Sequence, residues 1–98
     1  MMDKTHLEVL RMRLLLLLEG SYPSAQHSDV LFLRITREYG TDTCIRDIVK
    51  ELHYLTEKGL VALEPIIADR FMTTITAAGR DVISGHSKVA GIADFDRA

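Results

Sequence analysis

Residues 43–58 carry the side chains whose types and spacing could bind a ligand. Apolar residues recur there every three or four positions, which predicts a helix buried along Ile45, Ile48, Val49, Leu52 and Leu55. At about 100° per residue the opposite side presents Thr43, Asp47, Lys50 and Tyr54, flanked by Arg46, Glu51 and Glu57. Arginine and lysine can contact guanine or phosphate, and threonine can contact a phosphate or a thymine methyl group. This side is therefore a candidate nucleic-acid surface, with Thr43, Arg46, Lys50 and Tyr54 as its residues.

Charge both supports and opposes that hypothesis. Arg34 and Arg37, on the preceding helical segment, could hold the phosphate backbone, and Arg70 is the basic residue nearest the tip of a later hairpin. The formal net charge is nevertheless −2, from 12 Lys and Arg against 14 Asp and Glu, whereas nucleic-acid binders usually show a basic balance or a basic face. An ordinary solvated helix face of mixed charge is the alternative interpretation.

Catalytic and metal-binding patterns are missing from the sequence. It contains no phosphate-binding loop, nucleophile elbow, HExxH or glycine-rich dinucleotide turn, so neither an enzyme nor a cofactor is expected. Sensors of soft metals need several converging thiolates and imidazoles, but this chain has one cysteine and four histidines. Cys44 and His53 would lie on opposite sides of one helix. We expect no metal, Cys44 packed as a small apolar residue, and the histidines at the surface.

The first half of the chain predicts three helices. Residues 4–19 are rich in good helix formers and end at Gly20, and residues 21–24 are typical of a turn. Ser28 is a suitable N-cap for a helix over residues 30–39 that Gly40 terminates. Thr41 or Asp42 would cap the helix over 43–58, which Gly59 ends. Two helices joined by a short glycine-containing turn fit the helix-turn-helix pattern.

The second half predicts a hairpin and a short helix. Residues 60–64 and 70–76 are β-compatible, with residues 65–69 as their connection. Thr76 would cap a helix over 77–84, closed by Gly85. The expected fold is mainly α with a small β-hairpin: a winged helix-turn-helix domain over residues 1–85, with a three-helix unit, a two-stranded wing and a short C-terminal helix, and then a tail over 86–98.

Two strings resemble known regulators. Leu52-x-x-Leu55-x-x-x-Gly59-Leu60-Val61 looks like a recognition helix turning into a wing strand, and Ile75-Thr76-x-x-Gly79-Arg80 is similar to the closing motif of MarR-, PadR- and ArsR-type regulators. Over nearly its whole length the chain is similar to small ArsR-like proteins of Mu-like phages and prophages, including the Gly-x-x-x-Val-Ala-Gly-Ile string at residues 85–92. It departs from them at residues 93–98, which are acidic and lack proline. The resemblance implies the winged-helix fold and a phage or prophage context. The order of a helix-turn-helix and a hairpin, with Arg34, Arg37, Arg46 and Lys50 placed to meet DNA, predicts a transcriptional regulator that binds double-stranded DNA as a homodimer.

A protein-interaction module that has lost DNA binding is the second hypothesis. The connection between the hairpin strands offers Glu64 and Asp69, which would repel a phosphate backbone. Ile66 and Ile67 beside them would either contact a phage or host protein from an exposed tip or fold back on the core.

The composition of the first helix suggests a dimer. It is apolar on most sides, which suggests burial against its own core and against a second copy, with Leu7, Leu14 and Val82 as interface candidates. The central helix of a monomer is the alternative.

The apolar run at residues 14–18 is far too short to span a bilayer and the start of the chain lacks a secretory cleavage site, so a cytoplasmic protein without membrane contact is expected.

Overall fold

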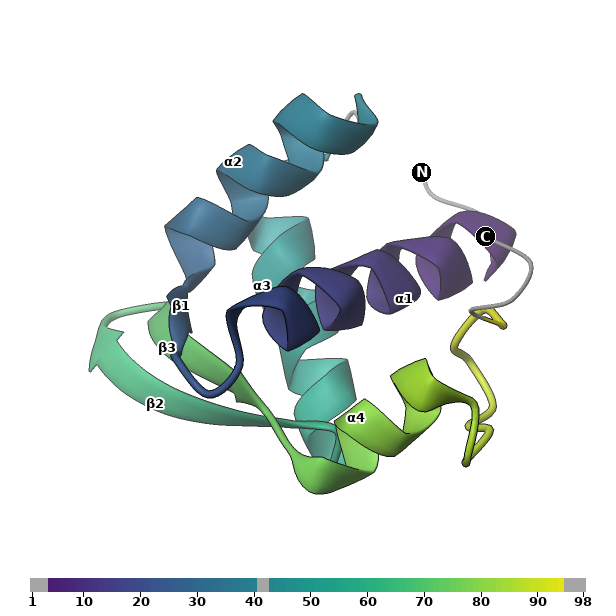
Figure 1. The fold of residues 1–98 in the computed structure, drawn as a ribbon. Coiled ribbons are helices and arrows are strands. Elements are labelled where there is room, and N and C mark those ends of the chain that lie inside the picture. Colours follow the sequence, from purple (N-terminus) through teal and green to yellow (C-terminus); the bar gives the residue numbers. More distant parts are fainter. Residues whose placement is uncertain (1–3, 41–42, 95–98) are drawn as a thin grey trace.

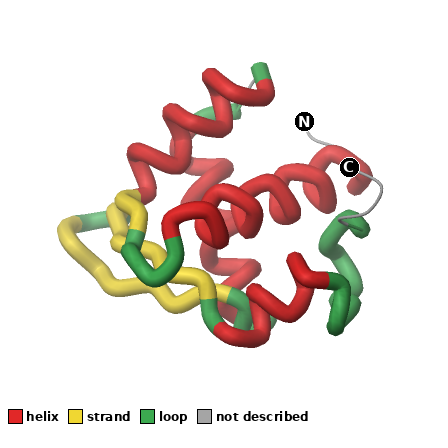
Figure 2. Tube along the Cα trace, viewed as in Figure 1, coloured by secondary structure: helices red, strands yellow, loops and turns green. Residues whose placement is uncertain are grey.

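Four helices and one three-stranded antiparallel sheet make up the residues that the computed structural model describes, 4–40 and 43–94 (Figure 1). In chain order they are α1 (Lys4–Ser21), β1 (Gln26–His27), α2 (Ser28–Tyr39), α3 (Ile45–Glu57), β2 (Val61–Ile67), β3 (Arg70–Ile75) and α4 (Ala77–Ser84). The expected mixture of helices with a β-hairpin is confirmed. The helices dominate and the strands gather at one end (Figure 2).

α1 crosses the middle of the fold and contacts α2, α3, α4 and β3 (Figure 1). Its buried side chains are Leu10, Met12, Leu14, Leu15, Leu17 and Leu18. A helix surrounded by its own chain must be apolar on most sides, so the central-helix interpretation accounts for its composition. The sequence predicted that α1 ends at Gly20, but Gly20 lies within the helix. The helix continues to Ser21, whose hydroxyl donates to the Leu18 carbonyl at 3.1 Å.

α2 begins two residues earlier than expected, and its N-cap is His27 rather than Ser28. The Nδ1 atom of His27 accepts a hydrogen bond from the backbone N–H of Asp29 at 3.0 Å. The hydroxyl of Ser28 is fully buried and instead accepts from the backbone N–H of Phe71 in β3 at 3.2 Å. Ser28 therefore joins α2 to the sheet. Gly40 ends α2 with a φ of 61°, as predicted.

α3 is shorter than the predicted helix over 43–58. Cys44 is its N-cap, and the Asp47 carboxylate accepts from the Cys44 backbone N–H at 3.3 Å. The predicted caps Thr41 and Asp42 lie outside the described residues. Cys44 is exposed, so the expectation that it packs as a small apolar residue is wrong. At the other end the chain turns through Gly59, whose φ is 76°.

β3 lies between β1 and β2. β1 was not predicted because two residues are too short to show a periodic pattern. β2 runs to Ile67, so residues 65–67, expected in the connection, belong to the strand, and the turn is reduced to residues 68–69. Pro65 is tolerated because β2 is an edge strand, where a missing backbone N–H need not break a ladder, and the register shifts beside it.

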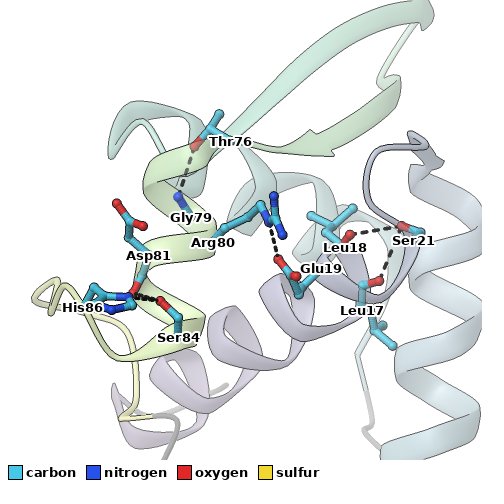
Figure 3. A network of polar contacts seen from close by, with 10 residues as sticks. All are labelled: Leu17, Leu18, Glu19, Ser21, Thr76, Gly79, Arg80, Asp81, Ser84 and His86. Carbon is cyan, nitrogen blue, oxygen red and sulfur yellow. Dashed lines mark hydrogen bonds and ion pairs between the residues drawn. The ribbon is translucent and has the colours of Figure 1, made fainter.

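The string Ile75-Thr76-x-x-Gly79-Arg80 fastens α4 to the rest of the fold (Figure 3). Thr76 caps α4 by accepting from the Gly79 backbone N–H at 3.1 Å, while its hydroxyl donates to the Gly59 carbonyl at 2.7 Å. Gly79 packs so closely on the Leu60 backbone that a Cβ there would collide with it. Arg80 donates to the Glu19 carboxylate of α1 at 3.0 Å, and this hydrogen bond raises the pKa of Arg80. The predicted helix over 77–84, with its Thr76 cap and Gly85 end, is confirmed.

Candidate nucleic-acid interface

Arg46 and Lys50 are exposed on the first two turns of α3, one helical turn apart. Neither forms an ion pair with another residue in the described ranges. Their side chains are thus available to an anionic ligand. We call this pair the cationic face of α3.

The acidic side chains of α3 are mostly withdrawn from that face. Glu51 is 2 % exposed, and its carboxylate lies 2.6 Å from the Nε atom of Arg11 in α1. Asp47 is half-buried and binds the Cys44 backbone and thiol at the start of the helix. Glu57 is exposed in the last turn. Sequence reasoning placed Glu51 beside the cations because its partner is 40 residues away, where helical spacing gives no signal.

Tyr54 and Thr43 lie differently from the sequence expectation. Tyr54 is half-buried: the Arg11 guanidinium lies 3.6 Å from its ring centroid, and its hydroxyl donates to the Ala90 carbonyl at 3.3 Å. Thr43 precedes α3, and its hydroxyl oxygen is buried without a hydrogen-bond partner among the described residues. The outward orientation expected for Thr43 is therefore wrong, because the chain has not yet entered the helix there.

The remaining basic candidates differ in their surroundings. The Nε atom of Arg34 lies 2.9 Å from a carboxylate oxygen of Glu38, one turn further along α2. Arg37 is exposed and has no ion pair with a described residue. Arg70, at the start of β3, pairs with Asp29 at the start of α2 at 2.8 Å. Arg37 is thus the α2 cation most available to a ligand.

The predicted interface residues are largely internal. Leu14 is fully buried, and Val82 is 8 % exposed in the same core, while Leu7 is half-buried. The prediction that Leu14 lies at a dimer interface is wrong, because other elements of its own chain cover α1 there. Dimerisation itself stays a prediction, which sedimentation at micromolar concentration tests.

The hairpin tip is apolar and solvent-facing. Ile66 and Ile67 are 47 % and 71 % exposed, so they do not fold back on the core. Leu33 and Val30 on α2 are also exposed large apolar residues. Glu64 and Asp69 are exposed at the same tip.

No group of three or more His, Cys, Asp or Glu residues within 4–40 and 43–94 could hold a metal ion. Across those same residues, no helix has both the length and the apolar character needed to cross a bilayer. Comparisons of the chain with protein-family models, curated proteins and solved structures find no match.

Proposed function

We propose that this chain is a winged helix-turn-helix protein that binds double-stranded DNA, a transcriptional regulator of phage or prophage origin acting in the bacterial cytoplasm. In this assignment α3 is the recognition helix and the β2–β3 hairpin is the wing. The order of the elements supports it, since two helices joined through Gly40 precede an antiparallel hairpin. In helix-turn-helix units the second helix enters the major groove with its N-terminal residues nearest the base edges.

The cationic face of α3 is the observation that carries the proposal. Arg46 and Lys50 lie in the first half of α3, where such helices read DNA. Burial of Glu51 against Arg11 removes the negative charge that would otherwise lie next to Lys50. Arg37 at the end of α2 adds a third exposed cation that suits a backbone phosphate.

A titration of a short DNA duplex over a range of salt concentrations tests this function. Three phosphate contacts predict a slope of log affinity against log salt of about −2.7. Replacing both Arg46 and Lys50 by Ala should make that slope shallower by about 1.8 units, whereas Lys88→Ala, an exposed cation of the tail, should leave it unchanged. Absence of binding to phage or host DNA at low salt would overturn the proposal.

The homodimer belongs to the same proposal and can be tested on the same DNA. Two α3 helices bound to one site would contact half-sites about 34 Å apart, one turn of the duplex. Band-shift stoichiometry on sites with one and with two half-sites distinguishes a dimer from a monomer. Equal affinity for both sites would exclude the dimer.

A protein-interaction module is the second candidate, and the exposed hairpin tip favours it. Ile66 and Ile67 offer apolar surface, while Glu64 and Asp69 beside them disfavour contact with phosphate. If this candidate holds, Ile66→Asp releases a phage or host protein partner and Arg46→Ala with Lys50→Ala does not. The reverse result would favour DNA.

A further inference from the structure

Arg11 lies where three segments distant in sequence meet. From α1 its Nε atom reaches the Glu51 carboxylate of α3 at 2.6 Å, and its Nη1 atom donates to the Gly91 carbonyl at 3.0 Å. The guanidinium also stacks on the Tyr54 ring at 3.6 Å. Its side chain is 13 % exposed. A planar guanidinium can make all three contacts at once, which a lysine ammonium cannot.

The described part of the tail, residues 86–94, docks on this junction rather than extending into solvent. The Tyr54 hydroxyl donates to the Ala90 carbonyl at 3.3 Å, and the Ala93 backbone N–H donates to the Glu8 carbonyl of α1 at 3.1 Å. Val89 and Ile92 pack against the hydrophobic core. In Figure 1 the tail accordingly runs beside the first turns of α1.

Gly91 makes this docking possible. Its φ is 90°, a conformation that residues with a Cβ rarely adopt. A Cβ at this position would also collide with the Tyr54 hydroxyl. A residue with a Cβ at position 91 would therefore both strain the backbone of the tail and displace the Tyr54 hydroxyl.

We propose that Arg11 is a positioning residue for the cationic face of α3 and that the tail holds α3 in its binding orientation through Arg11 and Tyr54. Glu51 directly follows Lys50, and Tyr54 lies one turn beyond Lys50. Anchoring these two side chains therefore adds to the buried apolar side chains of α3 in fixing the rotation of the helix about its axis. Release of the tail would then move Arg46 and Lys50 without removing either. The inference rests on the proposed DNA binding.

Gly91→Ala is the variant that tests the proposal, because it undocks the tail from a position outside α3. We expect the dissociation constant for a DNA duplex to rise about tenfold. Amide hydrogen exchange should accelerate in the tail and also in α3 at residues 50–55. Arg11→Lys should reproduce both effects, and Lys88→Ala, in the same tail segment, should reproduce neither.

Two outcomes would overturn the inference. One is unchanged DNA affinity in Gly91→Ala although exchange shows that the tail is released. The other is fast exchange in the tail with unchanged exchange in α3, a result that counts against the coupling even if the parent chain binds no DNA. Exchange thereby separates failure of this inference from failure of the proposed function. If Gly91→Ala does not fold, Tyr54→Phe removes only the hydroxyl bound to Ala90, and its α3 exchange must still accelerate.

Discussion

Glu51 shows how the burial of one residue changes the exposed charge of a helix. Its carboxylate is buried and belongs to the interior ion pair with Arg11, although it is a neighbour of Lys50 in sequence. A buried charge is stable only when it is paired and hydrogen-bonded. The charge available to a ligand on α3 is therefore more positive than the composition of the helix indicates.

Replacing Glu51 by Ala should lower the free energy of unfolding by about 3 kcal/mol, because the Arg11 guanidinium would keep its mostly buried position without its carboxylate partner. Denaturant unfolding measures this change. Glu57→Ala is the matched control, since Glu57 is an exposed glutamate on the same helix and should change stability by less than about 0.5 kcal/mol. Equal effects of the two variants would mean that the Arg11–Glu51 pair contributes nothing specific.

At the scale of elements, glycines at two positions have opposite consequences. Gly79 in α4 packs directly on the Leu60 backbone, which brings the start of β2 against the helix. A methyl group added at Gly20, near the end of α1, would instead point into open space, with no packing partner within 4 Å. Close packing therefore requires glycine at position 79, whereas no packing contact requires it at position 20.

Gly79→Ala should therefore destabilise the fold by about 2 kcal/mol, because backbone must move to admit the added methyl group. Gly20→Ala should stabilise it by about 0.5 kcal/mol, because alanine loses less conformational entropy than glycine on entering a helix. Thermal unfolding of the two variants compares them directly. A stabilising Gly79→Ala would show that α4 does not pack on Leu60 as described.

Local patterns explain which elements the sequence predicts. The apolar spacing of α3, and the Thr76 cap and Gly85 end of α4, each lie within a short stretch of chain, so these helices follow from them. The N-cap of α2 cannot be predicted from local sequence. Ser28 is the better capping residue, but its hydroxyl accepts a hydrogen bond from the backbone N–H of Phe71 in β3, 43 residues along the chain. The Arg11–Glu51 pair and the docking of the tail were missed for the same reason, since each depends on a partner distant in sequence. β1 was missed both because two residues show no periodic pattern and because its partner strand, β3, is distant in sequence.

At the scale of the whole molecule, the formal charge of −2 and the exposed cations of α3 lead to different expectations for an anionic partner. At an ionic strength of 0.1 M the Debye length is about 10 Å, so an incoming phosphate responds mainly to charges near its point of contact. The distribution of charge should then outweigh its sum.

Lys50→Glu and Lys88→Glu separate these expectations, because both change the net charge by the same amount. Lys50 belongs to the cationic face of α3, whereas Lys88 lies in the tail, where its ammonium is 3.7 Å from Asp94. We expect Lys50→Glu to weaken binding to a DNA duplex at least about tenfold and Lys88→Glu to weaken it less than about twofold. Fluorescence anisotropy at low and moderate salt measures both. If the two variants lost affinity equally, the summed charge would govern binding and α3 would not be the contact surface.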